Sequence, residues 1–247
     1  MLIAFFSRHI PKFGWMSLLF TAMALSGCGG GSSNGATATY SASAYFTKTA
    51  VNNSWTLSGT SATTSTVTGI ASSSATISHF YQNTIFANGV VTQTDTKTTN
   101  GVAAAPQTST NQIDATGNYV STTNGVTEID LPASFSAGTS WTALIAAPPV
   151  SVLTGTIAGV GVSRTVPGGT FTDCVQINIS DTISGSGTSG GNTYSYSGPI
   201  SETLYYSPTV GQAIETSTTA TLTYTGALTG TVTTADSKKL QPGYIAN

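Results

Sequence analysis

The stretch TATLTYTGALTGTVT, residues 219–233, decides the fold class of this chain. Threonine occupies seven of the eight alternate positions from 219 to 233, whereas Ala220, Leu222 and Tyr224 fall on the other side. Successive side chains of a β-strand point to opposite faces, so a period of two is typical of a half-buried strand. The stretch therefore predicts one long strand, or two strands joined at Gly226.

Shorter alternating runs recur along the chain, at 64–70, 84–94, 126–131, 174–179 and 203–206. Clusters of Gly, Asn, Ser and Pro separate them, as at 100–111 and 184–193, and such clusters are typical of turns and loops. No stretch after residue 40 shows the apolar stripe of an amphipathic helix. We expect an all-β fold: a long antiparallel meander that forms a curved sheet or an open half-barrel.

The composition excludes one class of partner. Charged residues make up 6% of the 247 residues and the formal net charge is -2, so no basic patch for nucleic acid is expected. Hydrophobic residues reach 39%, which is enough to build a buried core. We expect a folded domain, not a disordered chain.

The N-terminus predicts a targeting signal. Arg8 and Lys12 precede an apolar run, residues 13–25, that is too short for a comfortable membrane span of about 20 residues. The run ends in LSGC, residues 25–28, which resembles the lipoprotein signal of bacteria and would make Cys28 the lipidated first residue. An ordinary secretory signal or a short membrane anchor remains the alternative.

These features divide the chain into three parts. Residues 1–27 are expected to be a lipoprotein signal peptide, 28–39 the lipidated cysteine with a flexible Gly/Ser tether, and 40–247 a single β domain. The partner of Cys28 would be the membrane, through acyl chains such as palmitate. Gly29, by resemblance to the sorting rule of Gram-negative bacteria, favours the outer membrane, with the domain facing either the periplasm or the outside.

Cys174 has no intrachain partner if Cys28 is acylated, since the chain has two cysteines. No His or Arg lies near it in sequence to lower its pKa and activate it. We expect a buried apolar residue and no structural disulfide.

The search for catalytic groups finds little. His79 is the one histidine after the signal peptide, and the GTSGG pattern around Ser189 lacks the helix that a nucleophile elbow requires. Glu128 and Asp130 share one side of a strand, where a solvated outer face is the expected reading. No catalytic residue, metal site or cofactor is predicted. A hydrolase would have to use these two acids or His79.

Four tyrosines stand out as contacts for a ligand or partner: Tyr194 and Tyr196 in one strand-like run, Tyr205 and Tyr206 in the next. Were the two runs neighbouring strands, their aromatic rings would line up. Cross-strand packing is the favoured interpretation, and a groove for an apolar ligand or a protein partner is the alternative.

Two turns are predicted from Pro and Gly. Pro167 with the two glycines after it indicates a tight reversal before a strand that begins at Phe171. Pro208 and Gly211 indicate a short hairpin. Trp55 and Trp141, each entering a strand after a turn, are expected to close the ends of a core.

Three segments in this order carry a resemblance: LPASFSAGTSW (131–141), RTVPGGTFTDCVQI (164–177) and LYYSPTVGQAIETS (204–217). Together they resemble a group of uncharacterised bacterial lipoproteins with Val-Pro-x-Gly-x-Phe-x-x-Cys and Tyr-Tyr-x-Pro-x-Val-Gly motifs. AYFTKTAVNNSWTL (44–57) is similar to the opening segment of that group, with Asn52 in place of its usual glycine. The resemblance implies a β-rich domain outside the cytoplasm and supplies no catalytic residue.

The sequence therefore favours a lipid-anchored, non-enzymatic protein of the cell envelope that binds a partner or an apolar ligand, or assists assembly of the envelope or surface. A surface adhesin or coat protein is the first alternative. A hydrolase of envelope glycans or esters is the second.

Overall fold

The computed structural model describes residues 38–46, 50–145 and 151–247. The expected signal peptide, Cys28 and nearly all of the tether lie outside the described residues. One four-residue helix, α1 (Ala42–Tyr45), accompanies the strands, so the all-β prediction is confirmed. The strands are β1 (Tyr40–Ser41), β2 (Ser54–Ser65), β3 (Ser73–Ala87), β4 (Val90–Thr99), β5 (Val102–Ala103), β6 (Gln107–Ile113), β7 (Tyr119–Thr123), β8 (Val126–Leu131), β9 (Ser134–Phe135), β10 (Ser140–Ile145), β11 (Ser151–Val166), β12 (Gly169–Ser189), β13 (Asn192–Ser207), β14 (Gln212–Gly226) and β15 (Gly230–Leu240).

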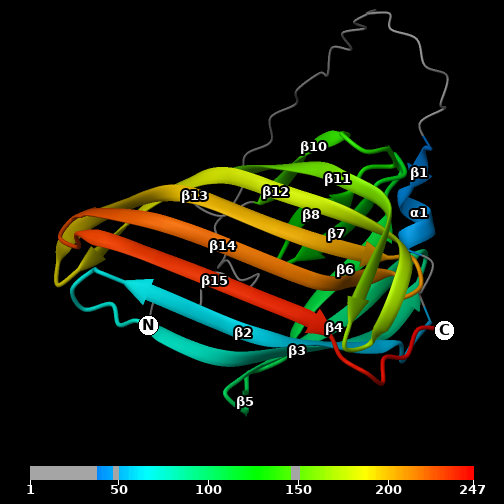
Figure 1. The fold of residues 1–247 in the computed structure, drawn as a ribbon, viewed down its shortest axis with the longest axis horizontal. Coiled ribbons are helices and arrows are strands. Elements are labelled where there is room, and N and C mark those ends of the chain that lie inside the picture. Colours follow the sequence, from blue (N-terminus) through cyan, green and yellow to red (C-terminus); the bar gives the residue numbers. More distant parts are fainter. Residues whose placement is uncertain (1–37, 47–49, 146–150) are drawn as a thin grey trace, which may run out of the picture.

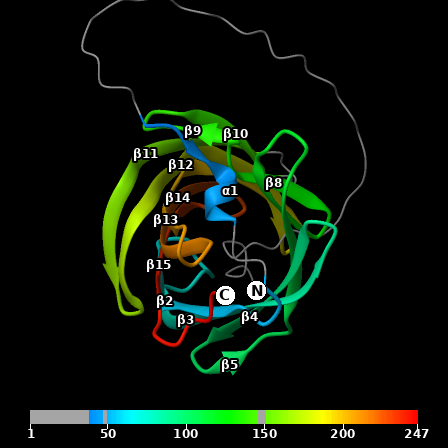
Figure 2. The same cartoon turned by 90° about the vertical axis from the view of Figure 1, so that its right-hand side faces the viewer.

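The main sheet is an antiparallel meander that curls almost into a closed barrel (Figures 1 and 2). Its strand order is β10-β11-β12-β13-β14-β15-β2-β3-β4-β6-β7-β8, with β5 paired to β4. β1 and β9 form a separate two-stranded sheet. Edge strands β8 and β10 come together at one seam. The expected curved meander is thus confirmed, and it closes further than a half-barrel.

The 219–233 stretch forms two strands, not one. β14 ends at Gly226, whose φ of 92° suits a residue without a Cβ, and β15 starts at Gly230. On β14, Leu222 and Tyr224 are buried whereas Thr219 and Thr223 are exposed. The predicted alternation is confirmed, with the threonines on the outside.

Two of the predicted strands are wrong. In 84–94 the chain reverses at Asn88 and Gly89, whose φ angles of 52° and 79° suit a tight hairpin turn. In 64–70 only the first two residues continue β2, and Val67 folds inward to 3% exposure at the end of the barrel. The expected loop at 100–111 is also too long, since β6 begins at Gln107.

The glycine-rich stretch 184–193 is mostly strand, which corrects the loop prediction. Gly185 and Gly187 on β12 pair with Tyr196 and Tyr194 on β13. Each tyrosine ring lies over its glycine: an added Cβ would come within 2.4 Å of Tyr196 and 2.5 Å of Tyr194. The rings thus cover the strand where the glycines lack side chains.

Three buried clusters hold the barrel. One cluster, which we call the helix-side core, packs α1 against β7, β12 and β13. A second, which we call the far-end core, lies near the β12–β13 and β14–β15 turns. The third includes residues of the hairpin between β11 and β12; we call it the arm core, and it contains Trp55, Leu57, Val166, Phe171, Cys174, Val210, Ile214 and Leu240. The helix-side core contains Ala42, Tyr45, Tyr119, Leu131, Phe135, Ile157, Val175, Ile177, Leu204 and Tyr206. The far-end core contains Val67, Tyr194, Leu222, Tyr224 and Val232.

The hairpin where β11 meets β12, residues 162–174, folds over the outside of β13 and β14 toward β15 (Figures 1 and 2). We call it the arm. Its tip is the predicted reversal at Pro167, and the backbone N–H of Gly168 donates to the carbonyl oxygen of Leu240 at 2.8 Å. Cys174, at the base of the arm, is fully buried, as expected, and burial raises the pKa of its thiol to about 11.

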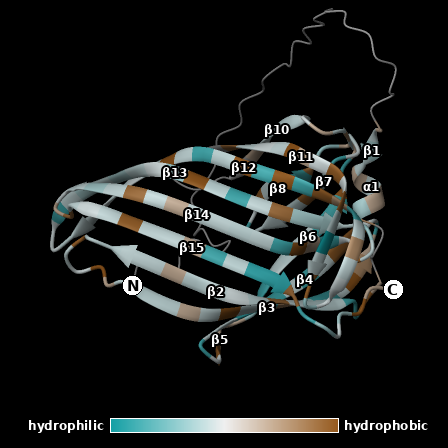
Figure 3. Ribbon diagram, viewed as in Figure 1, coloured by the Kyte–Doolittle hydropathy of each residue, from teal (hydrophilic) through white to brown (hydrophobic). Residues whose placement is uncertain are grey.

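Most of the barrel wall is neither strongly hydrophilic nor strongly hydrophobic, because serine and threonine dominate it (Figure 3). The clearly hydrophilic end of β15 holds Asp236, Lys238 and Lys239. Asp236 and Lys238 lie opposite inner-face residues of the neighbouring strands, whereas Lys239 belongs to the opposite face. Several of the few charges therefore point inward, where solubility does not require them.

Candidate functional site

A cavity of about 240 Å³ lies inside the barrel. Residues of β2, β3, β4, β7, β8 and β10–β15 line it, so residues far apart in sequence meet there. A concave site of this kind, with mixed polar and apolar walls, is the usual form of a small-molecule site.

One wall of the cavity is apolar. Ile177 and Ile179 from β12 and Ile200, Leu204 and Tyr206 from β13 line it. These residues alternate along their strands with outward-facing polar ones, as the period of two requires. Glu202 lies on the same inner face of β13, between Ile200 and Leu204, so one carboxylate interrupts the apolar surface that this wall offers to a ligand.

An aromatic stack forms another part of the lining. The Trp55 ring is stacked on Tyr81, with centroids 5.4 Å apart and planes 16° apart. Tyr81 is in turn stacked on His79 at 5.9 Å. The predicted role of Trp55 in closing a core is confirmed, and its ring also faces the cavity.

The remaining lining carries most of the charge. Four carboxylates, Asp95, Glu128, Asp130 and Glu202, face one ammonium, Lys238. The expectation that Glu128 and Asp130 lie on a solvated outer face is wrong. Pairing with β7 sets the orientation of β8, and Glu128 lies opposite Ser121, which is buried at 3% exposure on the inner side.

His79 is a buried ionisable side chain of the lining, at 3% exposure. Its Nδ1 lies 3.0 and 3.1 Å from the two carboxylate oxygens of Asp95. Burial lowers the pKa of His79 below 6.5, and the hydrogen bond with Asp95 opposes that effect without cancelling it. The neutral ring then donates from Nδ1–H to Asp95, which makes Nε2 a hydrogen-bond acceptor.

That Nε2 atom is buried and has no hydrogen-bond partner among the described residues. Thr216 also lines the cavity, and its Oγ1 is likewise buried without a hydrogen-bond partner among the described residues. Asn111 Nδ2 and Asp236 Oδ1, the other two such atoms, sit on the inner face of β6 and β15. Unsatisfied buried polar atoms are rare in folded proteins, and two of these four belong to residues that line the cavity, where a ligand could satisfy them.

The four tyrosines proposed as contacts divide between three places. Tyr194 and Tyr196 lie on one strand, β13, together with Tyr205 and Tyr206, so the two runs are not neighbouring strands as supposed. The first two pack against Tyr224 at 5.9 and 5.5 Å, which is cross-strand packing. Tyr206 lines the cavity, and Tyr205 faces outward below the Arg164 guanidinium, 4.3 Å from the ring centroid.

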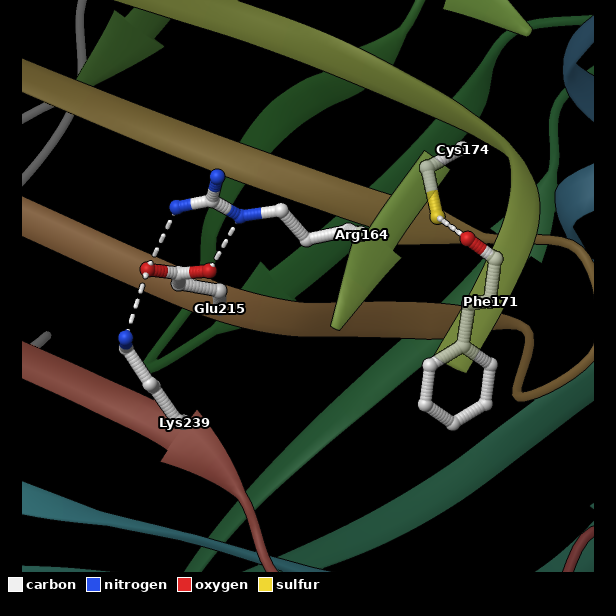
Figure 4. Close-up of polar contacts among 5 residues, drawn as sticks. All are labelled: Arg164, Phe171, Cys174, Glu215 and Lys239. Atoms are coloured by element: carbon white, nitrogen blue, oxygen red, sulfur yellow. Dashed lines mark hydrogen bonds and ion pairs between the residues drawn. The ribbon is translucent and has the colours of Figure 1, made fainter. Parts of the chain in front are cut away.

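The arm is fixed by an ion cluster that the sequence did not predict (Figure 4). Arg164 on the arm donates from Nη2 to Glu215 Oε1 at 2.9 Å and from Nε to Oε2, while Lys239 Nζ lies 3.5 Å from Oε1. Burial would raise the pKa of Glu215, but the hydrogen bonds and charges of Arg164 and Lys239 lower it overall. The only sequence signal was an acid within the otherwise uncharged strand 212–226.

Catalytic and metal chemistry find no assembled site in the part of the chain that the structure describes. No three of its His, Cys, Asp and Glu residues converge to hold a metal ion. No described hydroxyl or thiol bonds His79 Nε2, and Ser189 is exposed at the end of β12, before a turn into another strand. None of the described helices has the length and apolar character to cross a membrane.

No protein-family model matches the chain, and no curated protein matches it in sequence. The residues of the cavity therefore carry the functional argument.

Proposed function

We propose that this chain is a lipid-anchored protein of the cell envelope, at the outer membrane, that binds a small amphipathic molecule inside its barrel and catalyses no reaction. The cavity carries this proposal. An apolar wall on β12 and β13 faces a lining of charged and hydrogen-bonding groups, so a molecule with both kinds of surface is complementary to it. The LSGC signal and the resemblance to bacterial lipoproteins support the location.

The barrel suits binding because its wall is rigid where the cavity lies. Long strands hydrogen-bonded on both sides hold Ile200 and Leu204 in place, and Leu204 also belongs to the helix-side core. A site formed in advance loses little conformational entropy when its ligand arrives.

Binding is tested with prodan, a neutral naphthalene dye whose emission changes in apolar surroundings. We expect saturable binding to the wild-type protein, and loss of at least about tenfold in affinity when Ile200→Trp fills the cavity. Thr219→Trp, on the exposed outer face of β14, is the matched control and should bind normally.

Ile179→Phe serves as a second filling variant, and circular dichroism shows whether each variant is folded. Saturable binding that the folded filling variants retain would place the dye elsewhere and overturn the proposal, as would no binding at all by the wild-type protein.

A further inference from the structure

The charges around the cavity are unequal. Asp95, Glu128, Asp130 and Glu202 contribute four carboxylates to its lining, and Lys238 contributes one ammonium. Inside a protein such charges act through a lower effective dielectric than in water, so a ligand of positive charge is favoured and an anion is repelled. The excess is a property of the whole lining, whatever hydrogen bonds the individual carboxylates make.

His79 supplies a second, independent observation. The His79 side chain is 3% exposed and its ring lines the cavity. Its Nε2 atom has no hydrogen-bond partner among the described residues. Because Asp95 accepts from Nδ1–H, the neutral ring offers a lone pair at Nε2. A ligand group that forms a hydrogen bond with this Nε2 atom must be an O–H or N–H donor.

The groups that face His79 keep it in this form. Asp95 bonds it from β4, and the charges of Lys97 on β4 and Lys238 on β15 both disfavour its protonation. Leu57, its cross-strand neighbour on β2, is apolar and buried. The ring is therefore an acceptor at neutral pH, beside a carboxylate.

The aromatic stack suits the same ligand. Trp55 and Tyr81 line the cavity beside His79, where their rings add apolar surface for the body of the ligand. Beyond them, Ile177, Ile200 and Leu204 accommodate an uncharged body.

We infer that the ligand is an amine: a small molecule with a protonated amino group, held by the His79–Asp95 pair and the other carboxylates, joined to an apolar body that packs on β12 and β13. This inference rests on the proposed function and names the chemical class of its ligand.

Three probes of matched shape test it: 2-phenylethylamine, 2-phenylethanol and 3-phenylpropanoate, each used to displace prodan from the purified full chain at pH 7.5. We expect the amine to displace the dye at a concentration about tenfold lower than the alcohol, and the carboxylate to be the weakest. Tryptophan fluorescence gives a second readout, because Trp55 lines the cavity, and its change on binding should persist in Trp141→Phe, which leaves Trp55 as the tryptophan of the expected β domain.

Two isosteric variants test whether the preference for the amine arises in the cavity. Asp95→Asn keeps an oxygen that accepts from His79 Nδ1–H, and Glu202→Gln keeps an acceptor for the Thr218 hydroxyl, 3.2 Å from Glu202 in the wild type. Each should reduce the amine's advantage over the alcohol several-fold and leave displacement by the alcohol unchanged. Asp173→Asn, which removes an exposed carboxylate from the arm, is the matched control and should change neither.

The outcomes separate the two proposals. If the alcohol displaces prodan as well as the amine, or if both cavity variants keep the full preference, the inference is overturned while ligand binding stands. If prodan does not bind the wild-type protein, both fall.

Discussion

Trp141 on β10 donates its indole N–H to the backbone carbonyl oxygen of Ile129 on β8, at 2.8 Å. These two strands are the edges of the sheet, and no ladder pairing joins them within the described residues. A side chain thus spans the seam where the meander leaves backbone groups unpaired. The tryptophan expected to close the end of a core also closes the barrel wall.

The seam depends on a glycine opposite the indole. A Cβ added to Gly155 would lie 2.5 Å from the Trp141 ring, so we expect Gly155→Ala to displace the indole and destabilise the protein by about 2 kcal/mol. Trp141→Phe should cost about 1 kcal/mol through the lost hydrogen bond. Urea unfolding measures both, and Gly155→Ala should cost much less in a Trp141→Ala background. Equal costs in the two backgrounds would show that the indole is not the obstacle.

The arm should loosen when Glu215 loses its charge. Glu215→Gln leaves Arg164 and Lys239 without their carboxylate, and we expect a loss of about 1–2 kcal/mol, since both cations are partly exposed. Amide hydrogen exchange should accelerate in residues 162–174 more than in β2 or β3. Glu202→Gln, on the inner face of β13, is the control that should leave arm exchange unchanged. Uniform acceleration across the barrel would contradict a local role.

Stability should fall in mild acid through His79. Its pKa is lower in the folded protein than in the unfolded chain, so the unfolded state binds more protons as the pH drops through about 6.5. The contribution is fully present above that pH and is lost toward the lower folded pKa, with a slope of at most about 1.4 kcal/mol per pH unit. Urea unfolding between pH 5 and 8 measures it. His79→Gln should flatten the profile in the upper part of this range, and an unchanged slope would reject the assignment.

The membrane anchor is tested on the two cysteines. We expect Cys28→Ser to abolish palmitate labelling and to release the protein from the membrane fraction. Cys174→Ala should do neither, because this thiol is fully buried and its pKa is about 11. Labelling that persists in the Cys28 variant would exclude this residue as the lipid site.

Local patterns in the sequence predicted the strands that are half-buried. The Thr/Leu alternation of 219–233 and the turns at Pro167 and Pro208 appear as expected, because each depends on nearby residues alone. The Asn-Gly pair at 88–89 is a strong signal for a hairpin turn. The prediction of one strand over 84–94 gave more weight to the apolar residues on either side of it. The glycines of 184–191 predicted a loop where the chain forms a strand. Tyrosine rings from the neighbouring strand cover these glycines, and the local sequence does not show that contact.

The site was harder to predict because it depends on which strands meet. Nothing local in β8 shows that Glu128 faces inward; the pairing with β7 decides it. Asp95 joins His79 from the adjacent strand β4, but Thr216 and Lys238 join it from strands more than a hundred residues away in sequence. The sequence singled out His79, Glu128, Asp130 and Tyr206 one by one, but not that they line one cavity.

The pairing of β2 with β15 has a consequence for how the protein folds. Leu57 meets Leu240 across this ladder, so the last long strand must be available before the first one gains its second neighbour. Until then both strands keep an open edge that another chain can pair with. Contacts of such long sequence separation form slowly. If the signal peptide acts as expected, the pairing of β2 with β15 takes place after export. Folding of this barrel is therefore the step at which pairing with another chain competes most with the native ladder.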